Sequence, residues 1–173
     1  MELVDLGYSG EPDTIDEEIR LRDEGKSHTF SFCMWPRMWR SYRSLTELDW
    51  QSFHLTPDDA EVVPDQPGVY AFLIKPSMEG VLGASYLVYV GQTSRTLRQR
   101  FKEYLREKNA RFGRKKIVEF LKKYDNHIHF SCAIVNGSID PEQVESELLK
   151  AYMPPANSDF PAEVKRIVPY QSF

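Results

Sequence analysis

The sequence predicts an α/β protein of the α+β kind, in which helices cover a small sheet, and three observations support this prediction. Short runs rich in β-branched and aromatic residues occupy residues 68–75, 85–90 and 127–135. Helical patterns occupy residues 94–108, 114–124 and 141–153. Their order along the chain, β, β, α, α, β, α, is that of one compact unit beginning near Pro67.

The first two runs are joined by "PSMEGVLGA", which predicts a hairpin loop. Ser94 is placed to cap the helix that follows, and Gly91 is expected to let the chain turn tightly before it. In that helix Leu97, Phe101 and Leu105 are expected to face the core. The last helix opens on Asp140 as its N-cap with proline next, and ends before two further prolines.

The residues before Pro67 give a less regular pattern. Residues 1–25 are acidic and polar and are expected to be weakly ordered. The stretch "SHTFSFC" (27–33) alternates like a strand, and "SLTE" (44–47) fits a capping box that opens a short helix toward Phe53. We therefore expect four parts: a flexible segment (1–25), a Trp- and Arg-rich extension (26–65), the main domain (66–160) and a C-terminal tail packing on it (161–173).

Composition excludes few classes of protein. The chain carries a net charge of −4, and no apolar run reaches the roughly 20 residues that a membrane span needs. Cys33 and Cys132 lie far apart and match no metal-ligand spacing, which favours a reducing, cytoplasmic compartment. The four histidines form no ligand set, and His127 and His129, alternate residues of one strand, are interpreted as structural.

Charge is strongly segregated along the chain. Residues 1–24 hold nine acids and two arginines, whereas residues 95–123 hold twelve Lys or Arg and three acids. Such a block indicates a polyanion site in an otherwise acidic protein, or a solvated helical face. The candidate phosphate contacts are Arg95, Arg98, Lys102, Arg106, Arg114, Lys115 and Lys116.

Several separate pieces of sequence carry chemistry that could belong to one site. "GVY" places Tyr70 in the first strand, and "YVG" places Tyr89 in the second. Arg100 and Tyr104 lie four residues apart and so on one side of their helix. Glu145 lies in the last helix, and "PPAN" supplies Asn157 twelve residues later.

This set resembles the GIY-YIG nuclease family, whose two signature tripeptides appear here as "GVY" and "YVG". The resemblance covers about residues 66–160. It implies a mainly antiparallel, three-stranded central sheet flanked by helices, preceded here by an N-terminal extension. It also implies a metal-dependent DNA endonuclease that hydrolyses phosphodiester bonds.

The resemblance further implies a role for each residue. Tyr70 would act as general base toward the attacking water, and Arg100 would hold a phosphate oxygen. Glu145 would bind a single divalent ion, Mg²⁺ or Mn²⁺. Tyr89 would orient water or phosphate, Asn157 would fix the site by hydrogen bonds, and Tyr104 stands where members carry histidine or tyrosine.

The chain departs from the family pattern at two further places. Gln92 stands where many members carry lysine, and the spacing from Tyr89 to Arg100 is eleven residues, one longer than in some members. Each site residue also has an ordinary interpretation: the tyrosines as core residues and Arg100 as a solvated side chain. Glu147 is the rival to Glu145, although counting back from Asn157 favours Glu145.

Two functional hypotheses remain beside the nuclease. One is a nucleic-acid-binding adaptor that keeps the fold without turnover, and the other is a subunit of a larger assembly. DNA is the expected partner, with no membrane association. The Trp- and Arg-rich extension could stack on bases, dock on a protein partner, or pack on the main domain.

Overall fold

A computed structural model describes residues 12–76, 83–109 and 115–166. The chain divides into two compact units, residues 1–31 and residues 32–173. The Trp- and Arg-rich extension is therefore divided between the two units, and most of it belongs with the main domain. None of the helices in the described ranges has the length and apolar character needed to cross a lipid bilayer.

The first unit contains helix α1 (Pro12–Ser27), an element that the sequence pattern did not predict. Residues 13–24 contain neither glycine nor an internal proline and are rich in good helix formers. Near the C-terminal end, Lys26 pairs with Asp23 at 3.0 Å, and the cation suits the negative end of the helix dipole. The side chains of residues 17–27 are all exposed.

The second unit is built on a four-stranded, fully antiparallel sheet in the order β1-β4-β2-β3. The strands are β1 (Gln51–His54), β2 (Gly68–Ile74), β3 (Tyr86–Thr93) and β4 (Ile128–Ile134). The α+β class, the antiparallel pairing and the three strands expected after Pro67 are confirmed. The expected count of three strands is wrong, because the extension adds β1.

Strand β1 replaces the short helix expected from Ser44 toward Phe53. Its four residues pair with β4, and Phe53 lies directly opposite Phe130. Phe53 is half-buried there and Phe130 fully buried. Cross-strand pairing of this kind outweighs a local capping signal, which contributes only about 1 kcal/mol. The strand expected at residues 27–33 is also wrong, since Thr29–Trp35 forms no regular element and α1 includes Ser27.

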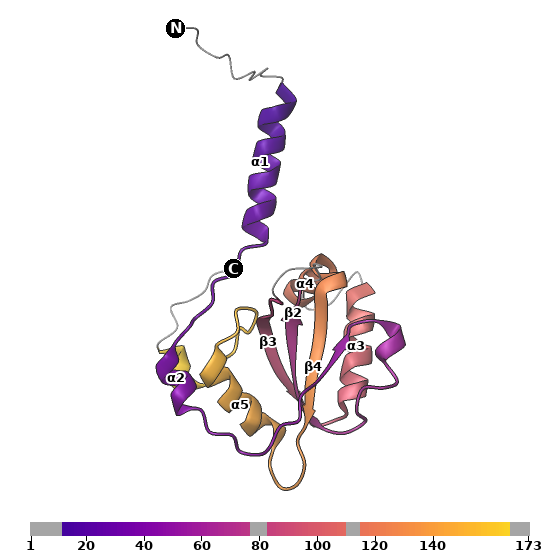
Figure 1. Cartoon of the computed structure of the whole chain (residues 1–173), viewed down its shortest axis with the longest axis vertical. Helices are drawn as coiled ribbons and strands as arrows, with labels where there is room; N and C mark the ends of the chain where they lie inside the picture. Colours follow the sequence, from indigo (N-terminus) through magenta and orange to yellow (C-terminus); the bar gives the residue numbers. More distant parts are fainter. Residues whose placement is uncertain (1–11, 77–82, 110–114, 167–173) are drawn as a thin grey trace. The chain divides into compact units, whose positions relative to one another are not determined.

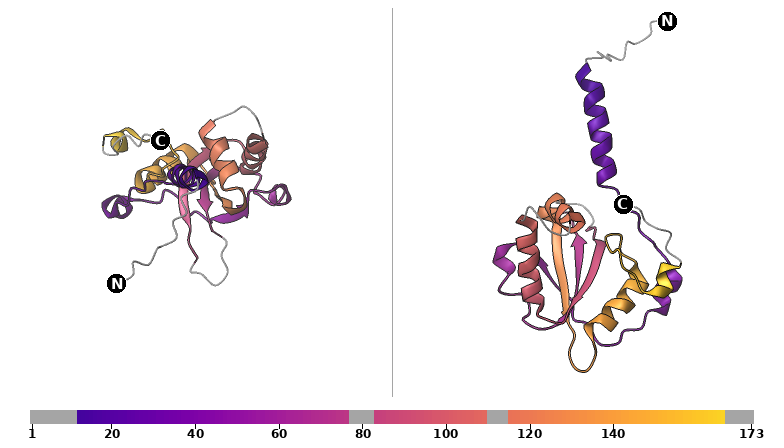
Figure 2. Two further views of the ribbon diagram at one scale, coloured as in Figure 1. Left: turned by 90° about the horizontal axis from the view of Figure 1, so that it is seen from above. Right: turned by 180° about the vertical axis from the view of Figure 1, so that it is seen from behind.

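Helices cover both faces of the sheet (Figures 1 and 2). On one face lie α3 (Leu97–Asn109) and α4 (Lys115–Lys123), where Phe72 of β2 packs against Tyr104 and Phe120. On the other face lies α5 (Pro141–Tyr152), where Val69 and Ala71 form a cluster with residues of α5 that includes Val144 and Leu148. The alternation of β2 side chains therefore separates two apolar layers.

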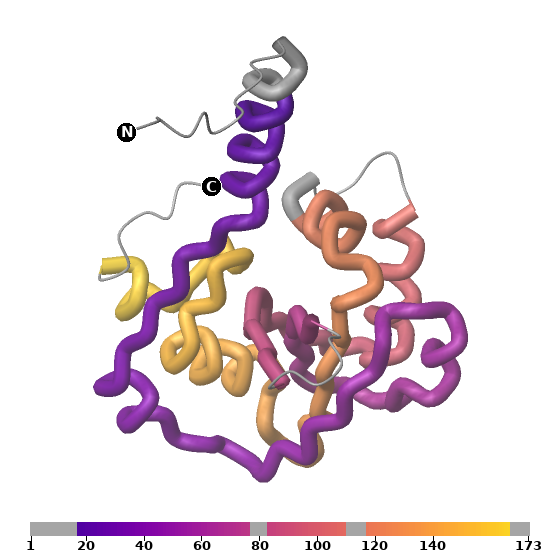
Figure 3. The backbone as a smooth tube through the Cα atoms, turned by 45° about the horizontal axis from the view of Figure 1, so that its top comes forward, coloured from indigo at the N-terminus to yellow at the C-terminus, as the bar shows by residue number. Residues whose placement is uncertain are grey.

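The extension crosses from one face of the sheet to the other, as the tube in Figure 3 shows. Helix α2 (Pro36–Ser41) contacts α5, and the chain then runs to β1 at the far edge of the sheet. After the short helix η1 (Pro57–Asp59), residues 63–66 reach the start of α3, where Gln66 O accepts from Leu97 N at 2.9 Å. A second short helix, η2 (Asp125–His127), precedes β4, and α6 (Ala162–Lys165) buries Val164.

Candidate active site

Tyr70, Arg100 and Tyr104 form one hydrogen-bonded group between β2 and α3. The Arg100 Nε donates to Tyr70 Oη at 3.0 Å, and a terminal nitrogen donates to Tyr104 Oη at 3.1 Å. The two tyrosine hydroxyls lie 2.9 Å apart. Tyr104 is fully buried and Leu105 only half-buried, which corrects the expectation that Leu105 completes the inner stripe of α3.

Gly91 makes room for the Tyr70 ring. The two residues are direct partners in the register of β2 and β3, and β3 continues to Thr93. A Cβ atom on Gly91 would lie 2.6 Å from Tyr70 Oη and 2.6 Å from its Cζ. The expected tight turn at Gly91 is therefore wrong: the glycine stands within a strand because another side chain fills the space above it.

Burial dominates the electrostatics of Tyr70. Its side chain is about 1% exposed, and this burial, together with Tyr104 and Tyr89, raises its pKa well above the ordinary value. The Arg100 charge acts in the opposite direction on the pKa of Tyr70 without offsetting the burial. Tyr70 is thus held as a neutral phenol in the free protein.

Glu103, which sequence reasoning missed, joins two arginines beside this group. Its Oε2 accepts from Arg100 at 2.8 Å and from Arg95 at 3.0 Å. The hydrogen bond from Arg95, followed by that from Arg100, lowers the pKa of Glu103 and keeps it ionised. Its position in the sequence could have indicated this role. Glu103 is one of three acids in the basic stretch, and it stands three residues after Arg100, on the same side of the helix.

Glu145 lies on α5 and lines a second part of the site, a cavity of about 370 Å³ that also includes Tyr89, Asn157 and Asp159. Burial, with the charges of Glu142 and Asp159, raises the pKa of Glu145 to about 7. Among the described residues it has neither a hydrogen bond nor an ion pair. The rival Glu147 instead binds Lys150 at 2.9 Å.

Asn157 fastens its segment to the edge of the sheet. Its Oδ1 accepts from Val90 N at 2.9 Å, and its Nδ2 donates to Val90 O at 2.8 Å. Ala156 N also donates to Val88 O at 2.9 Å, so the chain runs along the outer edge of β3. The oxygen and the nitrogen of this amide each make one hydrogen bond to the backbone of Val90.

Tyr89 lies between the two parts of the site. Its ring centroid is 6.3 Å from that of Tyr70, and it also lines the cavity of Glu145. Tyr70 and Arg100 do not line that cavity. Gln92 pairs with Val69 and lies on the opposite face of β3 from Gly91, with its buried Oε1 accepting no hydrogen bond from the described residues.

Among the described members of the expected basic set, Arg95, Arg98 and Lys102 lie beside acids. Lys102 binds Glu61 at 2.7 Å, and Arg98 lies 3.8 Å from Asp65 and donates to the carbonyl of Val63. Arg95 is bound to Glu103, while Arg106 is exposed and donates from its Nε to the Lys102 carbonyl. Arg114 lies outside the described residues, and Lys115 and Lys116 begin α4 with side chains that are not described.

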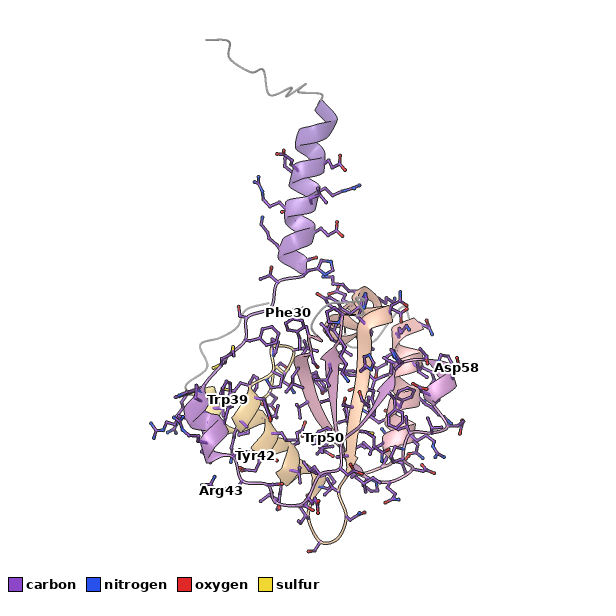
Figure 4. The ribbon with its side chains drawn as sticks, in the orientation of Figure 1. Phe30, Trp39, Tyr42, Arg43, Trp50 and Asp58 are labelled. Carbon is purple, nitrogen blue, oxygen red and sulfur yellow. The ribbon has the colours of Figure 1, made fainter. Side chains whose placement is uncertain are left out.

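The aromatic residues of the extension divide between packing and exposure (Figure 4). Tyr42 packs against the α5-side core, which matches the interpretation that this segment packs on the main domain. Trp39 and Trp50 are each 40% exposed, which leaves them able to contact a partner. Tyr42 and Trp50 line a cavity of about 870 Å³ on the face of the sheet away from Tyr70.

Comparisons with protein families, curated proteins and solved structures yield no match to this chain. Within the described ranges, no group of three or more His, Cys, Asp or Glu side chains is gathered in a way that could hold a metal ion.

Proposed function

We propose that this protein is a metal-dependent DNA endonuclease of the GIY-YIG type that hydrolyses phosphodiester bonds. The observation that carries the proposal is the bonding of Arg100 to the hydroxyls of both Tyr70 and Tyr104, next to Tyr89. These four residues are the ones that the two tripeptides and the following helix single out in the sequence. Their grouping in space supports a common task.

Arg100 has two tasks in this chemistry. Its guanidinium is permanently charged and suited to a non-bridging phosphate oxygen, whose negative charge grows as water attacks phosphorus. Its hydrogen bond to Tyr70 Oη favours the phenolate, the form that can take a proton from the attacking water. Because burial opposes ionisation of Tyr70, substrate binding must change the environment of this pair before the proton moves.

Glu145 fits a single divalent ion such as Mg²⁺ or Mn²⁺. Its carboxylate is half-buried in a cavity, lacks a cationic partner among the described residues, and has a pKa raised to about 7. A cation would stabilise the ionised form, and Mg²⁺ is commonly held by one or two carboxylates together with substrate phosphate. When bound, the ion would supply positive charge to the phosphate and its leaving oxygen.

The second candidate function is a nucleic-acid-binding adaptor without turnover, and the position of Glu103 supports it. The Glu103 carboxylate forms an ion pair with Arg100, the residue that a phosphate would need to contact. Tyr70 is also buried as a neutral phenol. A protein that keeps these features in its complex would bind nucleic acid without cleaving it.

Cleavage of defined substrates separates the two candidates. Supercoiled plasmid, single-stranded and branched oligonucleotides are incubated with the protein in Mg²⁺, in Mn²⁺ or in chelator. We expect Mg²⁺-dependent cleavage that falls by about 10²- to 10⁴-fold in Tyr70→Phe and Glu145→Gln. The matched controls are Tyr86→Phe, an exposed tyrosine of β3, and Glu147→Gln, the neighbouring carboxylate of α5.

Binding to DNA without cleavage in any metal would favour the adaptor. Cleavage by Glu145→Gln at the wild-type rate would contradict the metal-ligand role of that residue while leaving the nuclease proposal intact.

A further inference from the structure

Two histidines face each other on the sheet, at a place that the proposed nuclease chemistry does not use. His54 of β1 and His129 of β4 are direct partners in the strand register. Their ring centroids lie 4.0 Å apart with an angle of 46° between the ring planes. They lie on the face of the sheet away from Tyr70, since Phe130, the next residue after His129, stacks on the Tyr70 ring.

The strand geometry explains this close approach. The backbone N–H of His54 donates to Asp59 Oδ2 at 2.8 Å, while the next N–H, that of Leu55, points to Ile128 O of β4. The His54 and His129 pair is therefore of the non-hydrogen-bonded kind, in which opposite side chains come closest in an antiparallel sheet. Both imidazoles are held side by side by the backbone itself.

The surroundings contain one charge of each sign. Asp59 is fixed to the backbone of His54, and its negative charge acts on His129. Lys75 also acts on His129, but its ammonium group is engaged by Ser52 Oγ at 2.9 Å. Burial, followed by His54 and Lys75, lowers the pKa of His129 to about 4, so its ring is neutral at pH 7.

We propose that His54 and His129 together bind a divalent transition-metal ion such as Zn²⁺. Imidazole nitrogens suit Zn²⁺, Ni²⁺ and Cu²⁺, whereas Mg²⁺ prefers oxygen ligands, so this site is chemically distinct from that of Glu145. Because no third His, Cys, Asp or Glu completes a cluster in the described residues, the pair supplies two ligands and water fills the remaining positions. The ion would join β1, a strand of the extension, to β4 of the main domain.

The test measures Zn²⁺ binding by the full-length, untagged protein in competition with a chromophoric chelator. We expect one site that is lost, or weakened by about tenfold or more, in both His54→Gln and His129→Gln. His28→Gln is the matched control, since His28 lies in the other compact unit, and Glu145→Gln should keep the site. Zn²⁺ should raise the melting temperature of the wild type more than that of His54→Gln, whereas Mg²⁺ should affect the two proteins equally.

Two outcomes would overturn the proposal: wild-type protein that does not compete for Zn²⁺, or a His54→Gln variant that binds as wild type does. His54 is exposed, so this variant is expected to fold, and circular dichroism checks it. The result does not depend on nuclease activity, which is measured separately in Mg²⁺.

Discussion

Gly91 stands directly opposite Tyr70, and the space that a side chain on Gly91 would need is filled by the Tyr70 ring. The glycine of "YVG" thus leaves the space that the tyrosine of "GVY" fills. Tyr89 places a ring 6.3 Å from that of Tyr70, and Gly91, two residues on, leaves the hydroxyl of Tyr70 free to reach Arg100. The two signatures act as one packing unit across neighbouring strands.

Gly91→Ala should therefore destabilise the protein. The new methyl group must displace the buried Tyr70 ring, and overpacking of this kind costs about 1–3 kcal/mol. Urea unfolding measures the loss, with Gly83→Ala as control because a Cβ on Gly83 meets nothing within 4 Å. Equal stability of Gly91→Ala and wild type would show that the Tyr70 ring has room that the structure does not give it.

Glu103→Gln should strengthen binding of nucleic acid. The substitution removes the negative charge that Arg95 and Arg100 now share, so both cations become available to phosphate. We expect an affinity gain of about three- to tenfold at low salt that shrinks as salt is added.

Fluorescence anisotropy with a labelled oligonucleotide in chelator measures this gain without cleavage. Glu47→Gln, which removes a carboxylate near the α5-side cavity, controls for net charge. A gain of the same size in both variants would assign the effect to overall charge.

The raised pKa of Glu145 should make its contribution to stability depend on pH. The folded pKa is about 7, above the ordinary carboxyl value of about 4.3, so the folded state binds more protons between these values. The free energy of unfolding contributed by this group therefore falls as pH rises from about 4.5 to about 7. Glu145→Gln should be more stable than wild type at pH 8 by about 1–3 kcal/mol, after discounting for partial exposure.

Urea unfolding at pH 5 and pH 8 measures this difference for the pair of proteins, so that other titrating groups cancel. A difference between variant and wild type that is the same at both pH values would contradict the shifted pKa. Added Mg²⁺ should narrow the difference at pH 8 if the ion binds Glu145.

The two cysteines should react at very different rates. Burial raises the pKa of Cys132 to about 12, and its side chain is about 1% exposed, so the reactive thiolate is scarce and shielded at pH 8. Cys33 is partly exposed. A disulfide reagent should modify one thiol rapidly in the native protein and the second only in denaturant; rapid reaction of both would show that the β4 core opens readily.

Local pattern was enough to predict the elements from β2 to α5. The apolar, β-prone run at Gly68–Ile74, the alternation at Ile128–Ile134 and the helical period of Leu97–Asn109 each predicted one element that the structure contains. Within α3, Tyr104 rather than Leu105 completes the buried stripe. The grouping of Arg100 with Tyr104 also follows from helical spacing alone. These features depend on residues close together in the chain.

The features that the sequence did not predict depend on contacts between residues far apart in the chain. Strand β1 exists because Gln51–His54 finds the edge of β4, whose residues lie more than 70 positions later. Glu103 was missed because Arg95 and Arg100 converge on it only in the folded chain. Lys102 and Arg98 of the expected basic stripe likewise pair with Glu61 and Asp65 of the extension. Pairings of this kind have no local signature.

Strand β1 sets a practical limit on how the protein can be shortened. A fragment of residues 66–160, the span of the family resemblance, would lack the strand that covers β4 and would present a row of unpaired backbone amides and carbonyls. Such an open edge recruits strands from other molecules, so that fragment is expected to aggregate, whereas one beginning before α2 keeps the edge closed. The unit that folds is longer than the unit that the motifs outline.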